Sequence, residues 1–142
     1  MSYYFKSLFI IIMSLRLQVL SNHISTTMAE RPKISTHVLD TSRGLPGTGI
    51  SVSLYYFTNN QWTLIKESIT NSDGRCQDLI TPTGFAPGRY KLHYETENYF
   101  AARNTATFFP FIEVVFDVRS KQEHYHVPLL LNPFGYSTYR GT

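Results

Sequence analysis

The sequence predicts an all-β protein, in which about eight short strands pack as a two-layer β-sandwich with one short helix. After Lys33, apolar and polar residues alternate with the period of two that is typical of strands. Clusters of Gly, Asn and Asp interrupt this alternation at the spacing expected for turns between short strands. The 10 Tyr and 10 Phe residues supply packing between two sheets, and any left exposed at an edge would favour an oligomer.

Four strands are predicted in the first half of this region. In the first of them, residues 34–39, Ile34 and Val38 face one side while Ser35 and His37 face the other. Turns at residues 42–49, 59–60 and 71–74 separate it from strands at residues 50–57, 62–69 and 75–80. The last of these turns contains Asp and Gly, which accept the left-handed backbone geometry that tight turns need.

Four more strands are predicted in the second half, at residues 89–96, 111–118, 123–131 and 136–140. The one predicted helix covers residues 97–103, with Glu97 at its start and Arg103 at its end. This placement suits the helix dipole, because acidic residues stabilise the amino end of a helix and basic residues its carboxyl end.

Composition excludes several classes of protein. A chain of 142 residues has room for one domain and a short extension. The net charge is +3, and the folded part has no run of Lys or Arg, so nucleic acid is a poor candidate partner. The single cysteine, Cys76, cannot form an internal disulfide and is expected to be a small core residue. No Cys/His cluster has zinc-ligand spacing, which argues against a structural metal site.

Residues 1–30 differ from the rest and form a predicted N-terminal extension. The apolar run at residues 8–13 follows Lys6 and is too short to span a bilayer, which takes roughly 20 apolar residues. The same run resembles the apolar part of a secretory signal, although Arg16 fits that pattern poorly. Neither observation predicts a membrane protein.

A second interpretation of the extension is a targeting signal. Arg16-Leu17, five further residues and His23-Ile24 resemble the amino-terminal peroxisomal nonapeptide, which an import receptor recognises and which is not an anchor. The alternatives are a disordered leader, or a cytoplasmic protein if translation starts at Met28. Secretion is the less favoured outcome, and peroxisomal localisation is the prediction.

The carboxyl terminus is rich in specific polar groups. Its last residues are Tyr139, Arg140, Gly141 and Thr142, which together offer an aromatic ring, a guanidinium, a hydroxyl and a carboxylate. Chain ends are usually poorly ordered unless something holds them. Such a tail is therefore predicted to be folded into a site.

Two sequence blocks carry a family resemblance: STHVLDTSRGLPG at residues 35–47 and YHVPLLLNPFGYSTYRGT at residues 125–142. They resemble the two signatures of the transthyretin-like family, in its 5-hydroxyisourate hydrolase branch. The resemblance extends from about Lys33 to the last residue, and it implies a transthyretin-like hydrolase domain at residues 31–142. Transthyretin itself, a hormone carrier, shares the fold, so the site residues must decide the function.

The hydrolase branch is marked by residues that this chain contains and that the carrier lacks. They are His37, Arg75, His126 and the tail Tyr139-Arg140-Gly141-Thr142. One departure is Thr142, where the family usually ends in Ser. The hydroxyl is kept and a methyl group is added, which could raise the cost of binding substrate by about 1 kcal/mol.

The resemblance implies hydrolysis of 5-hydroxyisourate to 2-oxo-4-hydroxy-4-carboxy-5-ureidoimidazoline in urate degradation, a part of purine metabolism, by water attack on a lactam carbonyl. It implies no metal and no cofactor. We expect His37 and His126 to share the proton handling, because an imidazole titrates near neutral pH. Arg75 is expected to hold substrate oxygens and stabilise charge. Which histidine is the general base stays open.

The tail residues Tyr139, Arg140 and Thr142 are expected to orient the substrate ring, with the Thr142 hydroxyl or carboxylate near the chemistry. His124 is a predicted supporting neighbour, since it shares a strand face with His126, and Asp117 is a weaker candidate for orienting a histidine. The family site lies in a channel between the dimers of a homotetramer. The competing hypothesis is a transthyretin-type carrier that uses this channel for a small aromatic ligand, but charged and polar side chains there disfavour an apolar ligand.

Overall fold

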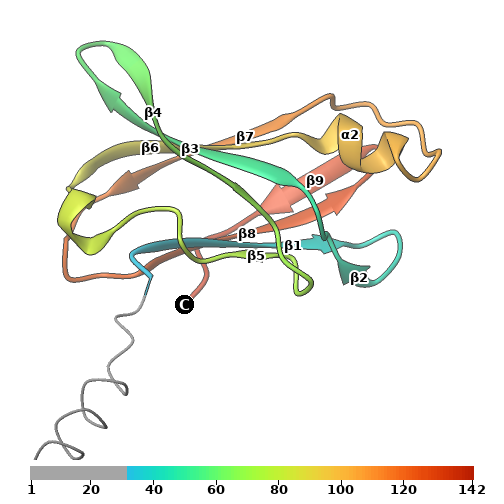
Figure 1. The fold of residues 1–142 in the computed structure, drawn as a ribbon, viewed down its shortest axis with the longest axis horizontal. Coiled ribbons are helices and arrows are strands. Elements are labelled where there is room, and N and C mark those ends of the chain that lie inside the picture. Colours follow the sequence, from blue (N-terminus) through green and yellow to red (C-terminus); the bar gives the residue numbers. More distant parts are fainter. Residues whose placement is uncertain (1–31) are drawn as a thin grey trace, which may run out of the picture. The chain divides into compact units, whose positions relative to one another are not determined.

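The computed structural model describes residues 32–142, which form two β-sheets packed face to face, as predicted (Figure 1). These residues contain nine strands and one short α-helix, α2. The strand count exceeds the predicted eight because the expected turn at residues 42–49 contains a two-residue strand, β2 (Leu45–Pro46). The all-β sandwich predicted from the alternating pattern is confirmed.

The first sheet is built around a parallel pair, β1 (Ile34–Asp40) and β8 (Tyr125–Asn132). Its order is β2-β1-β8-β9, where β9 is Gly135–Thr138, and β5 (Arg75–Cys76) also pairs with β1. β5 is paired opposite Thr36 and His37, whereas β2 is paired opposite Leu39 and Asp40. The middle of β1 therefore has β5 on one side and β8 on the other.

The second sheet is wholly antiparallel and has the order β4-β3-β6-β7. Its strands are β3 (Ser51–Thr58), β4 (Gln61–Ile69), β6 (Gly88–Tyr94) and β7 (Ile112–Val118). Asn59 and Asn60 close the β3–β4 hairpin with φ angles of 50° and 61°. Two successive residues at positive φ are the geometry of a type I′ turn, and the predicted turn at residues 59–60 is confirmed.

The predicted helix is present but shorter: α2 spans Thr96–Ala101 and has Glu97 in its first turn. Arg103 lies beyond its end, where the guanidinium donates a hydrogen bond of 2.7 Å to the Tyr99 carbonyl and covers the Tyr99 ring. A 3-10 turn, Pro82–Gly84, precedes β6. Within residues 32–142, no helix has the length and apolar character needed to cross a membrane.

The core lies between the sheets and is formed by every second residue of the strands. On β1 and β8, the fully or almost fully buried apolar members are Ile34, Val38, Tyr125, Val127, Leu129 and Leu131. Burying one such apolar side chain contributes roughly 1.5–3 kcal/mol. Because these apolar residues point into the core, the residues that alternate with them on β1 and β8 face outward.

β5 is shorter than predicted, but Cys76 has the role that the sequence predicts. The predicted strand at residues 75–80 pairs only at Arg75 and Cys76, and then Asp78 turns toward β4 to bind Lys66 and Ser68. Cys76 is buried as expected, and burial raises the pKa of its thiol. A buried thiol that resists ionisation is a packing residue rather than a nucleophile.

Candidate active site

Three of the predicted site residues lie on neighbouring strands of one sheet. His37 of β1 is paired directly with Arg75 of β5, and Ser35 of β1 is paired with His126 of β8. Paired residues share a face of the sheet. The residues of β1 that alternate with Ser35 and His37 are fully buried, and they are Ile34, Thr36 and Val38. His37, Arg75 and His126 therefore gather on the outer face of the sheet, each half-buried.

A chain of hydrogen bonds supports His126 from behind. The Ser35 hydroxyl lies 2.8 Å from His126 Nδ1 and 3.3 Å from His124 Nε2. His124 Nδ1 in turn contacts the Pro32 carbonyl oxygen, and the rings of His124 and His126 stack with 6.1 Å between their centroids. The predicted supporting position of His124 beside His126 is confirmed, and Ser35 joins the two histidines.

The surroundings of both candidate imidazoles favour the neutral form, because they lower the pKa of each ring. Burial, followed by the charge of Arg75, lowers the pKa of His37 from its ordinary value, against a smaller opposite effect from Asp73. Burial also lowers the pKa of His126, with further lowering by Arg75, His124 and His37. A neutral imidazole has a lone pair with which to accept a proton, as a general base requires.

The tail is held against β8 beside His126. β9 ends at Thr138 and not at Arg140 as predicted, because the next position on β8 is Pro128, which has no N–H for the ladder. The same register resumes at Gly141, whose N–H donates a 2.9 Å hydrogen bond to the His126 carbonyl. The predicted folding of the tail into this region is confirmed by that bond.

Gly141 approaches His126 too closely to carry a side chain. A Cβ at this position would lie 2.6 Å from His126 Cδ2 and 3.2 Å from Pro128 Cγ. Thr142 follows directly, so the terminal hydroxyl and carboxylate belong to the residue next to this contact. Tyr139 is largely exposed, and alternation directs it to the same face as Gly141. The roles predicted for Tyr139 and Thr142 stay predictions.

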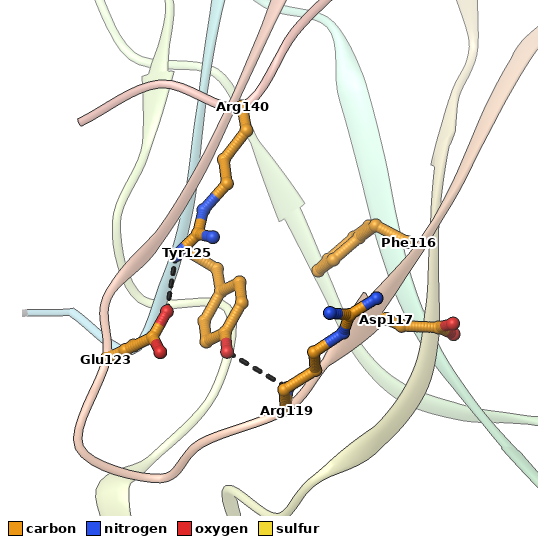
Figure 2. Close-up of a pocket in the computed structure, with 6 residues that line it drawn as sticks. All are labelled: Phe116, Asp117, Arg119, Glu123, Tyr125 and Arg140. Atoms are coloured by element: carbon orange, nitrogen blue, oxygen red, sulfur yellow. Dashed lines mark hydrogen bonds and ion pairs between the residues drawn. The ribbon is translucent and has the colours of Figure 1, made fainter.

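Arg140 lies apart from the three clustered residues. Its guanidinium donates a hydrogen bond to Glu123 and lies 5.1 Å from the centroid of the Tyr125 ring. Arg140 lines a pocket of about 590 Å³ that is also lined by Phe116, Asp117 and Arg119 and by none of the three clustered residues. Figure 2 shows its side chain directed toward Glu123 and Tyr125. A direct contact between Arg140 and a substrate at the histidines has no support within one chain, and it stays a prediction.

Two further residues lie outside the cluster. The suggestion that Asp117 orients a histidine is wrong: its two oxygens accept hydrogen bonds of 2.8 and 3.2 Å from Arg89, on the other sheet. His93 lies on the same sheet as Asp117, and its ring nitrogens bind Glu113 and Glu95. No three His, Cys, Asp or Glu side chains within residues 32–142 are arranged to hold a metal ion.

Sequence reasoning missed the contributions of Ser35, Pro32 and Gly141. Alternation places Ser35 on the same face as His37, so the pattern contained a signal for it. The Pro32 carbonyl and the close approach of Gly141 depend on register and backbone path, for which a single sequence has no signal. The assembled group offers neutral imidazoles, a permanent cation and a chain end at one place, a combination suited to hydrolysis of a polar substrate.

Comparison with known proteins identifies the family of this chain. A family model described as the HIUase/Transthyretin family matches residues 34–141, and the chain belongs to that family. The 5-hydroxyisourate hydrolase of Mus musculus is 44% identical over 115 residues, which cover 80% of this chain and 98% of the mouse protein.

Solved structures with the same fold include a hydrolase and a transthyretin. The 5-hydroxyisourate hydrolase of Klebsiella pneumoniae is 34% identical with a TM-score of 0.69, over 77% of this chain and 97% of that one. Sea bream transthyretin in complex with thyroxine is 29% identical with a TM-score of 0.74, over 78% and 95% of the two chains. Backbone similarity alone thus does not separate the hydrolase from the transthyretin.

Proposed function

We propose that this protein is a hydrolase that converts 5-hydroxyisourate to 2-oxo-4-hydroxy-4-carboxy-5-ureidoimidazoline, as a step of urate degradation. The observation that carries the proposal is the half-buried group of His37, Arg75 and His126 on the outer face of the first sheet. The names of the mouse and Klebsiella relatives support it.

In the proposed reaction, an imidazole takes a proton from water as the water oxygen attacks a lactam carbonyl. The guanidinium of Arg75 stabilises the oxyanion that develops, and the C–N bond then breaks as the proton is returned to the leaving nitrogen. A positioned general base contributes typically 10²–10⁴-fold to a rate. A donor to the oxyanion contributes about 10²–10³-fold.

We also propose that the protein is a homotetramer and that assembly completes the site. Among residues 32–142, one edge of each sheet is a strand with no neighbour on its outer side, β7 in one sheet and β9 in the other. The segment before β7 contacts the β8–β9 turn through the 2.8 Å hydrogen bond from Phe108 N–H to the Pro133 carbonyl. Near these edges Phe108, Phe111, Val115, Phe134 and Tyr136 are exposed. Exposed apolar groups beside open strand edges favour association.

The competing function is small-ligand carriage of the transthyretin type. The shared fold supports it, but the imidazoles and the guanidinium make the outer face polar. A carrier for an aromatic hormone needs an apolar slot with few polar groups. The two functions differ in what happens to a ligand, because a hydrolase consumes it and a carrier does not.

A single assay separates the two. Freshly generated 5-hydroxyisourate is mixed with the full-length protein, and ultraviolet absorbance follows its decay beside a protein-free sample. Acceleration in proportion to protein concentration is the expected result. Decay at the spontaneous rate with a tetrameric sample, together with saturable thyroxine binding, would favour the carrier.

Import into peroxisomes is a further proposal, supported by the motif Arg16-Leu17, five residues, His23-Ile24, which lies outside the described residues. Fusing residues 1–30 to a fluorescent reporter tests it, with Arg16→Ala as the matched control. We expect punctate fluorescence at peroxisomes that becomes diffuse in the control. Secretion of the reporter would contradict the proposal.

A further inference from the structure

The donor and the acceptor of each hydrogen bond behind His126 can be assigned in turn, starting at Pro32. The Pro32 carbonyl oxygen can only accept, so His124 Nδ1 is the donor in their contact. A neutral imidazole has one N–H and one lone pair. Because Nδ1 holds the proton of His124, its Nε2 is left as an acceptor.

Ser35 is the donor in the next hydrogen bond, to His124. Its hydroxyl lies 3.3 Å from His124 Nε2, and since that nitrogen accepts, the single hydroxyl proton of Ser35 is directed to it. The Ser35 oxygen then has lone pairs but no proton left for His126. The 2.8 Å contact between Ser35 Oγ and His126 Nδ1 must therefore be donated by His126.

From these contacts, and on the basis of the proposed hydrolase function, we infer that Ser35 and His124 are positioning residues. They hold His126 in the tautomer that has its proton on Nδ1 and its lone pair on Nε2. His126 is thereby assigned as the general base, a choice that the sequence leaves open. The ring nitrogen that accepts a proton is set by the hydrogen bond made by the other nitrogen.

The position of the free nitrogen suits this role. Nε2 is bonded to Cδ2, and Cδ2 is the atom of His126 nearest to the place that a Cβ on Gly141 would take. The lone pair thus belongs to the edge of the ring beside the chain end, while Nδ1 is directed inward to Ser35, which is almost fully buried. Nδ1 is thus occupied by Ser35, and Nε2 is the ring nitrogen left to accept a proton from water.

The charges around His126 support a neutral ring. Arg75 of β5, His37 of β1 and His124, which lies just before β8, all lower its pKa, after the larger effect of burial, and only the Ser35 backbone raises it. The tautomer argument requires His126 and His124 to be uncharged, because an imidazolium donates from both nitrogens. Arg75 also discourages a second positive charge at the site.

The test combines a spectroscopic and a kinetic readout on the full-length protein. In wild type, ¹⁵N-detected imidazole spectra at neutral pH should show His126 protonated at Nδ1 and unprotonated at Nε2. Ser35→Ala should remove that preference, and kcat for 5-hydroxyisourate should fall about 10–100-fold with little change in KM, the range for partners that orient a working histidine. Ser35→Thr keeps the hydroxyl and should restore both readouts.

A second variant covers the possibility that Ser35→Ala folds poorly. His124→Phe keeps a ring beside His126 but removes both nitrogens, and it should produce the same mixture of tautomers. His93→Gln is the matched control, since it removes a hydrogen-bonded imidazole from the other sheet and should change neither readout.

The spectra need no substrate, so the inference and the proposed function fail separately. A wild-type His126 protonated at Nε2, or Ser35→Ala and His124→Phe variants that keep the Nδ1–H tautomer, would overturn the inference. The inference would also be overturned if Ser35→Ala raised KM and left kcat unchanged. A wild type with the expected tautomer but no hydrolysis would leave the positioning intact and remove the proposed function.

Discussion

The two faces of the β1–β8 pair have the same backbone but different tasks. On the inner face, Ile34, Val38 and Leu129 are completely buried. On the outer face, His37 and His126 alternate with them and stay half-buried beside Arg75. The inner residues contribute area removed from water, whereas the outer ones contribute lone pairs and charge.

This difference explains how the site can be rigid and reactive together. Each outer side chain is fixed by the packing of its inner neighbours, because a shift of one residue in register would exchange the two faces. Sites built on strands are positioned more accurately than sites on loops. Substitutions on the inner face should therefore reduce stability, and those on the outer face should reduce activity.

The largest expected effect on stability is at the inner face. Leu129→Ala should lower the free energy of unfolding by about 2–5 kcal/mol, through lost burial and the cavity left behind. Urea unfolding at fixed protein concentration measures this. The neighbouring Leu130, on the outer face and half-buried, is the matched control, and Leu130→Ala should cost clearly less. Equal losses would mean that the two faces are not distinct in stability.

A substitution in the tail should have the opposite effect, since it should reduce activity and leave stability unchanged. Gly141→Ala would place a Cβ 2.6 Å from His126 Cδ2, so the tail or the imidazole must move. A displacement of about 1 Å near a reacting centre can cost roughly 100-fold in rate, and we expect a loss of that order in kcat/KM. Thermal unfolding should be unchanged, because the tail adds little to the core.

Gly135→Ala is the control for the tail, since a Cβ there meets nothing closer than 3.6 Å. Its activity should match that of wild type. An active Gly141→Ala enzyme would show that the contact between tail and imidazole is not needed for turnover.

Loss of a hydrogen bond to a buried polar group on the inner face should also reduce stability and leave activity unchanged. Tyr99 donates a 2.8 Å hydrogen bond to Asp40, which is fully buried. Burial would raise the pKa of Asp40, but the hydrogen bonds from Ser42 and Tyr99 outweigh it and lower the pKa. Tyr99→Phe should cost about 1–3 kcal/mol, the cost of an unsatisfied buried acceptor.

Denaturant unfolding measures that cost, and Tyr136→Phe, at an exposed ring, is the control. Activity per folded molecule should be kept in both variants. A loss of turnover in Tyr99→Phe at temperatures where it is folded would connect the inner face to the chemistry.

The smallest expected effect is electrostatic. Burial and then Arg75 lower the pKa of His37 and His126 below the ordinary 6.5. The unfolded chain therefore binds more protons than the folded one, and stability should fall as the pH drops below about 6.5. Arg75→Gln should raise both pKa values, although burial keeps part of the shift.

Nuclear magnetic resonance titration of the imidazoles follows this change directly. Arg119→Gln, at the separate pocket that Arg140 lines, is the control and should leave both values in place. Unchanged pKa values in Arg75→Gln would mean that the guanidinium does not act on the imidazoles.

Much of this arrangement could be predicted from sequence because strand alternation is a local property. Period-two alternation assigns His37 and His126 to faces opposite Val38 and Val127, and the structure agrees. What could not be predicted depends on contacts between distant segments. The Ser35 bridge joins positions 91 residues apart, and the direction of Arg140 is set by Glu123 and Tyr125. Pairing at β5 stops early because Asp78 binds β4.

The most direct measurement compares the decay of 5-hydroxyisourate with wild type, His126→Gln and His93→Gln, each confirmed to be folded. The division between faces predicts that His126→Gln loses about 10²–10⁴-fold of the enzymatic rate, the usual contribution of a general base. His93→Gln, which removes an imidazole from the other sheet, should behave as wild type. Full activity in His126→Gln would contradict the assignment of the chemistry to the outer face of β1 and β8.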